Sequence, residues 1–168
     1  MSNSTLAQVW TRHILDSYQL VGLIPSSDLL IDMGSGGGLP AIVLSIAGYN
    51  VSLVESDGKK VAFLREVSRV LELKNTIHHQ RVESVSLRNV SIITARAFAP
   101  VAAILLMLQK ELTSAHKLFL LKGKNWREEV SEAEKSYTFA HETRTSITDP
   151  SGVILILSNI QRRGVTAA

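Results

Sequence analysis

The stretch "IDMGSGGGLP", residues 31–40, packs four glycines into five positions directly after an apolar run. The residues that lead into it, "LLIDM", are typical of a buried strand, and "LPAIVLSIAG" continues with the period of a helix. Strand, tight glycine turn and helix are together typical of the first unit of a doubly wound α/β sheet, where ligands bind at the carboxyl ends of the strands. The stretch therefore predicts both a fold class and the place of a binding site.

Strands and helices alternate through the rest of the chain. A helix pattern over residues 4–20 precedes the glycine stretch, and the later elements are expected at 51–56 (strand), 59–73 (helix), 75–79 and 90–95 (strands), 100–110 (helix), 116–123 (strand), 126–136 (helix), and two final strand-like runs ending in "SGVILILSNI". This order predicts a mainly parallel sheet, with the last two strands pairing antiparallel at one edge through the "DPSG" turn. We expect one domain, 1–168, with residues 1–27 as a helical segment packed on it.

Composition bounds the possibilities further. With 168 residues, 45% of them apolar and 20% charged, the chain suits a single compact domain. No apolar run approaches the roughly 18 residues that span a bilayer, and we expect no secretion signal, because the opening residues lack a basic start followed by an apolar block. The absence of cysteine excludes disulfides and thiolate metal sites and fits a reducing cytoplasm. We expect no metal site, because His78 and His79 lack partners at ligand spacing. The net charge of +3 allows an anionic partner without specifying one.

The glycine loop departs from the loop that binds a dinucleotide. Leu39 stands where that fingerprint needs a third small residue for a pyrophosphate. Asp32 would repel a pyrophosphate but could hold an ammonium group or an ordered water. Glu55 ends the second strand about 20 residues later, where a carboxylate can accept hydrogen bonds from both ribose hydroxyls. The pattern favours S-adenosylmethionine, a zwitterionic cofactor without phosphate; a purely structural turn with a solvated Glu55 is the alternative.

Several segments in order, "WTRHILDS", "DMGSGGGLPAIVLSI", "LVESDGKKVAFLREV", "RVES", "TARAFAPV" and "LLKGK", resemble the bacterial glucose-inhibited division protein B family. The resemblance implies a class I, Rossmann-like methyltransferase with a seven-stranded sheet, S-adenosylmethionine as cofactor and guanine N7 of small-subunit (16S) ribosomal RNA as target. The free RNA and the small ribosomal subunit both remain open as partners. By the resemblance and the loop pattern, the expected cofactor contacts are Asp32, Gly34, Gly36, Leu39, Glu55, Val82, Glu83 and Arg96.

Guanine N7 carries a free lone pair, so we expect no general base. Arg96 follows the fourth strand and is the candidate that positions substrate or cofactor, for example through guanine O6. A buried structural ion pair is its alternative role.

Four residues are candidates for RNA contact: Arg12, His13, Lys122 and Lys124. A core histidine is the alternative for His13, and a solvated loop is the alternative for the two lysines. Two other functions stay open at this point, a non-catalytic RNA-binding protein with the same fold and, less favoured, a nicotinamide-dependent oxidoreductase. We expect a monomer.

Overall fold

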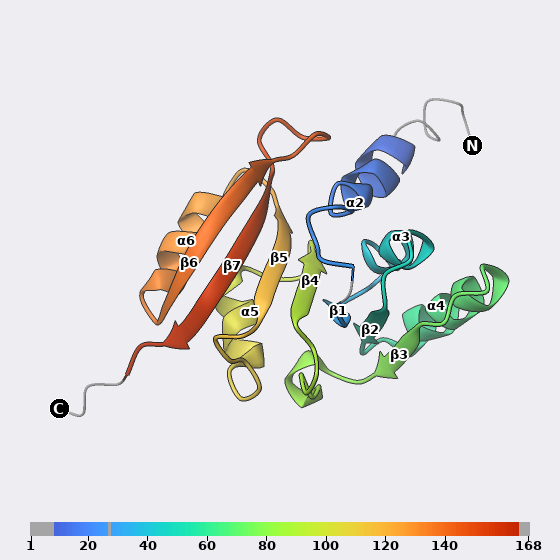
Figure 1. Ribbon diagram of the computed structural model, residues 1–168, viewed down its shortest axis with the longest axis horizontal. Coiled ribbons are helices and arrows are strands. Elements are labelled where there is room, and N and C mark those ends of the chain that lie inside the picture. The colour runs from blue at the N-terminus through green and yellow to red at the C-terminus, as the bar shows by residue number, and fades with distance from the viewer. Residues whose placement is uncertain (1–8, 27, 165–168) are drawn as a thin grey trace.

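A computed structural model describes residues 9–26 and 28–164 of the chain. Its centre is a seven-stranded sheet in the order β3-β2-β1-β4-β5-β7-β6 (Figure 1). The strands are β1 Leu30–Met33, β2 Val51–Glu55, β3 Thr76–His79, β4 Ile92–Arg96, β5 Lys117–Lys122, β6 Tyr137–Thr145 and β7 Val153–Arg162. Strands β1 to β5 are parallel, and β7 runs antiparallel to both β5 and β6. The predicted mainly parallel sheet with an antiparallel edge is therefore confirmed.

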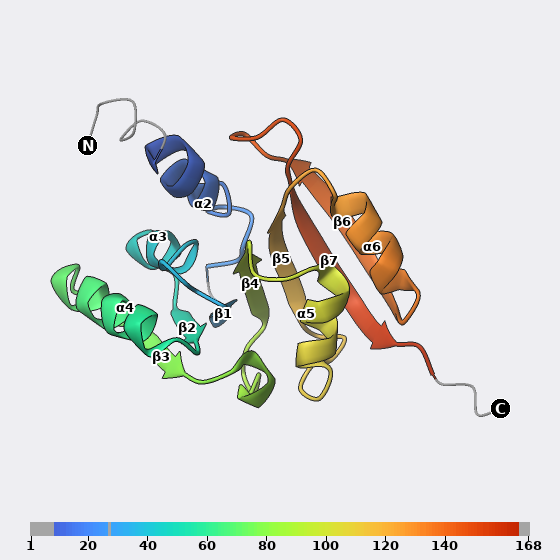
Figure 2. The same cartoon turned by 180° about the vertical axis from the view of Figure 1, so that it is seen from behind.

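Helices cover both faces of the sheet, as the two opposite views show (Figures 1 and 2). They are η1 Trp10–Leu15, α2 Asp16–Tyr18, α3 Ala41–Ile46, α4 Gly58–Val70, η2 Val82–Ser84, α5 Val101–Leu108 and α6 Trp126–Glu134. The N-terminal segment, α3 and α4 pack on one face, and η2, α5 and α6 on the other, each with its own apolar cluster. No helix in the described ranges is long and apolar enough to cross a membrane.

The periodicity of buried residues explains why α5 lies flat on the sheet. Val101, Ile104, Leu105 and Leu108 are all buried, at the spacing of three and four that places them along one side of a helix. Burying one such side chain contributes about 1.5 to 3 kcal/mol. Because this face holds α5 against the sheet, it also fixes the position of the segment that connects β4 to α5. That segment extends to the candidate site.

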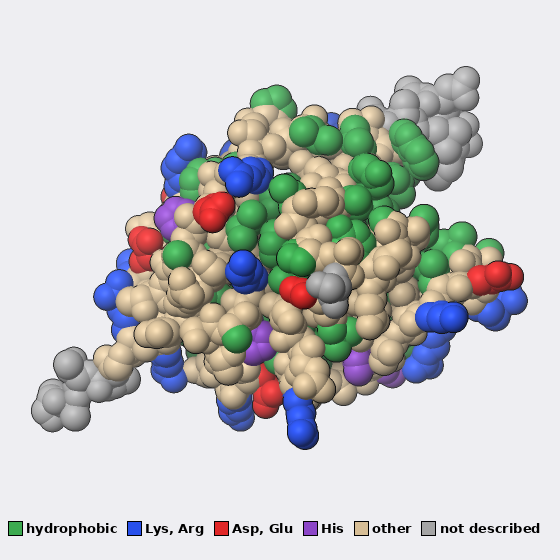
Figure 3. Space-filling view, in the orientation of Figure 1, with side chains coloured by type: hydrophobic (Ala, Val, Ile, Leu, Met, Phe, Trp, Pro, Cys, Tyr) green, Lys and Arg blue, Asp and Glu red, His purple; other side chains and the backbone are tan. Residues whose placement is uncertain are grey.

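The N-terminal segment differs from the regular helix predicted over residues 4–20. Residues 10–15 have π-helical hydrogen bonding and are followed by the single α-helical turn of α2, while residues 4–8 lie outside the described residues. Leu20 and Ile24 anchor the segment in the core. Trp10 and Tyr18 stay exposed, and apolar side chains gather over this segment and α3 on the face seen in Figure 3.

The order of the strands locates the site. The chain moves outward from β1 through β2 to β3 and then returns to pair β4 with the other side of β1. The loops that follow β1 and β4 therefore lie on either side of a crevice at the carboxyl ends of the strands, where doubly wound sheets bind ligands.

Candidate cofactor and substrate cavities

The glycine loop after β1 has a backbone that other residues rarely adopt. Gly34, Gly36 and Gly38 have φ angles of 65°, 52° and 87°. A Cβ atom on Gly34 would lie 2.2 Å from a ring carbon of Phe98, which comes from the loop after β4. Glycine is thus required at position 34 for two reasons: the backbone is left-handed, and the Phe98 ring leaves no space for a side chain.

Glu55, at the end of β2, holds this loop in place. Its Oε2 accepts a hydrogen bond of 2.9 Å from the Gly36 amide, and its Oε1 accepts bonds from the amides of Ser56 and Asp57 at 2.8 and 2.9 Å. A carboxylate offers about four acceptor positions, so about one is left. Two ribose hydroxyls, as predicted, would exceed this capacity unless the bond from Gly36 gave way.

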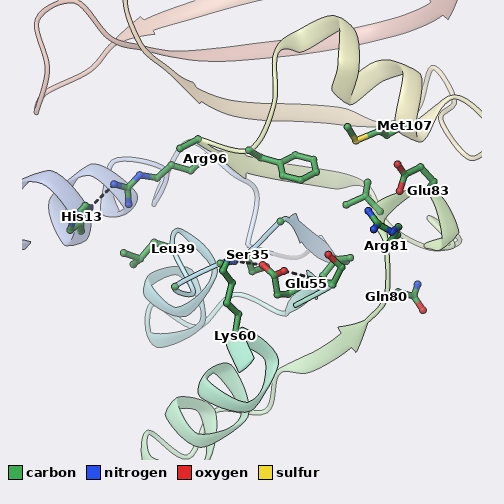
Figure 4. A pocket seen from close by; sticks show the side chains of 18 residues that line it. His13, Ser35, Leu39, Glu55, Lys60, Gln80, Arg81, Glu83, Arg96 and Met107 are labelled. Atoms are coloured by element: carbon green, nitrogen blue, oxygen red, sulfur yellow. Dashed lines mark hydrogen bonds between the residues drawn. The ribbon is translucent and has the colours of Figure 1, made fainter. Parts of the chain in front are cut away.

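A cavity of about 710 Å³ opens beside the loop, within the range of about 300 to 1,000 Å³ typical of small-molecule sites. Figure 4 shows its walls, which come from the ends of β1, β2 and β4 and from the chain around η2. The cavity is lined by most of the residues predicted to bind the cofactor: Gly34, Gly36, Leu39, Glu55, Val82, Glu83 and Arg96. Bare glycine backbone on one side and a carboxylate on the other fit S-adenosylmethionine, because the backbone admits a bulky ligand and the carboxylate can accept from a ribose hydroxyl.

Further residues that the sequence did not single out also line the cavity, among them Lys60, Gln80, Arg81, Phe98 and Met107. Arg81 and Phe98 lie inside the quoted segments "RVES" and "ARAFAP", so the segments were recognised although these side chains were not. Met107 is a partly buried residue of α5, and nothing in its local sequence separates it from the core residues around it.

Asp32 lies beneath the loop and is not among the residues that line the cavity. It is 1% exposed, and its Oδ1 accepts a 2.7 Å hydrogen bond from Thr94. Its Oδ2 has no hydrogen-bond partner within residues 9–26 and 28–164. Burial raises the pKa of Asp32 from 3.8 to about 7, against the opposing effects of the hydrogen bond from Thr94, of Ser35 and of nearby Arg96. The predicted direct contact between Asp32 and the cofactor finds no support in this position.

Arg96 ties the end of β4 to the N-terminal segment. Its Nη2 donates to the carbonyl of Arg12 at 2.9 Å and lies 2.6 Å from Nδ1 of His13, a contact drawn in Figure 4. Its Nε lies 3.1 Å from Oδ2 of Asp16. Because a guanidinium is only a donor, His13 accepts through Nδ1 and carries its proton on Nε2. The Arg12 carbonyl that accepts this bond belongs to the backbone of the π-helical turn η1.

Asp16 extends this cluster to the loop between β6 and β7. Its Oδ1 accepts hydrogen bonds from Thr148 at 2.6 Å and from Gln19 at 2.8 Å. A second cavity, of about 700 Å³, lies here and shares His13, Arg96 and Ala97 with the first. Two adjoining cavities that share His13, Arg96 and Ala97 suit a reaction that joins a cofactor and a second substrate.

The comparisons with known proteins agree with this geometry. The family model "rRNA small subunit methyltransferase G" matches residues 1–154. The chain belongs to this family. It is 42% identical over 167 residues to the ribosomal RNA small subunit methyltransferase G of Rhodospirillum centenum, covering 98% of this chain and 77% of the relative. The Gluconobacter oxydans relative of the same name is 42% identical over 163 residues, covering 96% and 84%.

The fold of this methyltransferase also matches solved structures. That of TYW2 from M. jannaschii, in complex with AdoMet, superposes with a TM-score of 0.65 at 16% identity, covering 90% of this chain and 76% of that one. This likeness establishes the class I fold, and family membership confirms the resemblance drawn from "RHILDS" and "ARAFAP". The oxidoreductase alternative is thereby set aside.

The two predicted lysine contacts of the methyltransferase have different surroundings. Lys124 is exposed. Lys122 has a side chain only 9% exposed, and its Nζ lies 2.7 Å from Oε2 of Glu129. The ammonium group of Lys122 is thus engaged within the protein, whereas that of Lys124 faces solvent. Arg12 and His13, in contrast, line the second cavity.

Proposed function

We propose that this methyltransferase transfers a methyl group from S-adenosylmethionine to N7 of a guanine in small-subunit (16S) ribosomal RNA. The observation that carries the proposal is the pair of adjoining cavities with Arg96 in their common wall. The first, beside Gly34 and Glu55, is the proposed cofactor site. The second, which Arg12 and His13 line, is the proposed binding site of the target base.

The chemistry asks mainly for positioning. S-adenosylmethionine supplies a methyl group on a sulfonium, and N7 attacks with a lone pair that needs no prior deprotonation. Holding two reactants in line contributes several kcal/mol to catalysis. This agrees with a site whose residues hold the reactants in place and that needs no general base. Glu55 and the loop from Gly34 to Leu39 would hold the cofactor, and Glu55 would use its remaining acceptor position for a ribose hydroxyl.

Arg96 is proposed to orient the base. Its Nε and Nη2 face Asp16, Arg12 and His13, which leaves Nη1 to donate to guanine O6 or to the cofactor. Methylation at N7 places positive charge on the guanine. The carboxylate of Asp16 lies in the wall of the same cavity and would offset that charge.

The proposal is tested with small ribosomal subunits purified from cells that lack this modification. Incubation with the protein and S-adenosylmethionine is expected to produce 7-methylguanosine in 16S RNA, measured by mass spectrometry of digested RNA. Arg96→Ala is expected to lower the yield at least tenfold, and Lys117→Met, at the exposed start of β5 away from the site, is expected to leave it unchanged. Binding of S-adenosylmethionine without any methylation would favour the non-catalytic alternative, and a preference for NAD in calorimetry would overturn the cofactor assignment.

The cellular location, the oligomeric state and the RNA contacts of the protein are part of the same proposal. A protein that modifies ribosomal RNA meets its substrate in the cytoplasm, and we propose that location and a monomeric state. Exposed Arg12 and Lys124 lie near the second cavity and at the end of β5, and we propose that both contact RNA phosphates.

A further inference from the structure

The partly buried ammonium group of Lys122 binds the segment that connects β4 to α5. Nζ of Lys122 donates a 2.6 Å hydrogen bond to the carbonyl of Ala99 and a 2.7 Å bond to Oε2 of Glu129. The same Glu129 oxygen accepts a 3.0 Å bond from the amide of Val101. Lys122 from β5 and Glu129 from α6 thus hold two backbone groups of one short segment, on either side of Pro100.

The segment carries the aromatic ring that meets the glycine loop. Phe98 directly precedes Ala99, and Ala97 before it has a left-handed backbone with φ of 48°. The Phe98 ring lies so close to Gly34 that even a methyl group on that glycine would collide with it. Phe98 and Gly34 both line the cavity proposed for the cofactor. A shift of this segment would therefore change the shape of that cavity.

We propose that Lys122 and Glu129 are positioning residues that hold Phe98 against the glycine loop and so set the affinity of the cofactor cavity. The inference builds on the proposed function in taking S-adenosylmethionine as the ligand. It assigns to Lys122 a role inside the protein in place of a contact with RNA.

The ion pair between Lys122 and Glu129 does more than bring two opposite charges together. A buried ion pair by itself is weak evidence for stability, because the cost of removing both charges from water offsets their attraction. Here each member also satisfies a backbone group, the carbonyl of Ala99 or the amide of Val101. Such bonds to a charged partner are about twice as strong as bonds between neutral groups. The arrangement favours one position of the segment.

The test separates positioning from simple stabilisation. In Lys122→Met, Glu129 keeps its charge without a cation, so both stability and cofactor affinity should fall. In the double variant Lys122→Met/Glu129→Gln the site is neutral and the glutamine oxygen can still accept from Val101. Thermal stability should then recover toward the wild type, while the bond to Ala99 stays lost. Lys117→Met, at the exposed start of the same strand β5, is the matched control.

Calorimetric titration with S-adenosylmethionine is expected to give a dissociation constant about tenfold higher in both the single and the double variant, and unchanged in Lys117→Met. Phe98→Ala should weaken binding similarly, and adding Lys122→Met to it should have little further effect, because both changes act through one ring. Recovery of affinity together with stability in the double variant would show that Lys122 is structural only and would overturn the inference.

A second readout needs no cofactor and so distinguishes a failure of this inference from a failure of the proposed function. Hydrogen exchange of the Val101 amide in the ligand-free protein should be several-fold faster in Lys122→Met and in the double variant than in the wild type, because its acceptor on residue 129 remains but the neighbouring Ala99 carbonyl is no longer held. Unchanged exchange would refute positioning by Lys122, whatever ligand the cavity binds. Failure of the wild type to bind S-adenosylmethionine would instead overturn the proposed function and the affinity part of the inference together.

Discussion

At the scale of single residues, Asp32 is a carboxyl group whose surroundings favour its neutral form. Burial is the largest cause of its raised pKa of about 7, and Thr94 compensates only in part. Between pH 4 and 7 the unfolded chain releases this proton while the folded protein keeps it. The contribution of Asp32 to the free energy of unfolding therefore falls as pH rises through this window, by at most about 4 kcal/mol.

Asp32→Asn removes this titrating group, so the free energy of unfolding of the variant should fall less as the pH rises. Urea unfolding at several pH values between 4 and 8 measures it: the wild type should lose stability relative to the variant as pH rises. Glu142→Gln, on exposed β6, serves as a control that should follow the wild type. Parallel curves for the wild type and Asp32→Asn would show that the carboxyl titrates as an ordinary aspartate.

Glu55 is predicted to act on both stability and binding, because its carboxylate already holds three amides. Glu55→Ala leaves those amides without this partner and should lower the free energy of unfolding by about 1 to 3 kcal/mol. Glu55→Gln can keep the oxygen that accepts from Ser56 and Asp57 but turns an N–H₂ group toward Gly36. It should be the more stable variant yet still bind S-adenosylmethionine more weakly than the wild type. Calorimetry and thermal unfolding test this, and wild-type affinity in Glu55→Gln would contradict it.

At the scale of elements, the N-terminal segment is held over both cavities by one ion pair and its neighbours. Arg96 and Asp16 each have side chains 18% exposed, so water screens their attraction little. Asp16→Ala removes the partner of Arg96 and the acceptor of Thr148 together. Hydrogen bonds to a charged group contribute about 1.5 to 3 kcal/mol. We expect the segment to detach at least tenfold more often.

Limited trypsin digestion reports this opening, because cleavage after Arg12 requires the segment to leave its place. The rate of cleavage there should rise about tenfold in Asp16→Ala and stay unchanged in Glu142→Gln. Global unfolding by heat should change less, since Leu20 and Ile24 still anchor the following residues in the core. An unchanged rate after Arg12 would show that the ion pair does not hold the segment.

At the scale of the whole molecule, local patterns in the sequence predicted the succession of elements well. The runs that became β1, β2 and β5 have consecutive buried residues, and the period of α4 and α5 places their buried residues on one side. The glycine turn and the acidic end of β2 also mark their places locally. The spacing of apolar side chains and the backbone preferences of neighbouring residues mark these features, so one sequence suffices to find them.

Three assignments needed the folded chain. Arg96 meets Asp16 from 80 positions away, Asp32 lies beneath the cavity rather than in its wall, and Lys122 faces inward to Ala99 and Glu129. The sequence alone determined the class of fold, the family resemblance and the loop where a cofactor is expected. Only the tertiary structure decided which charged groups are free to meet a ligand, because that depends on which distant segments bury and pair them.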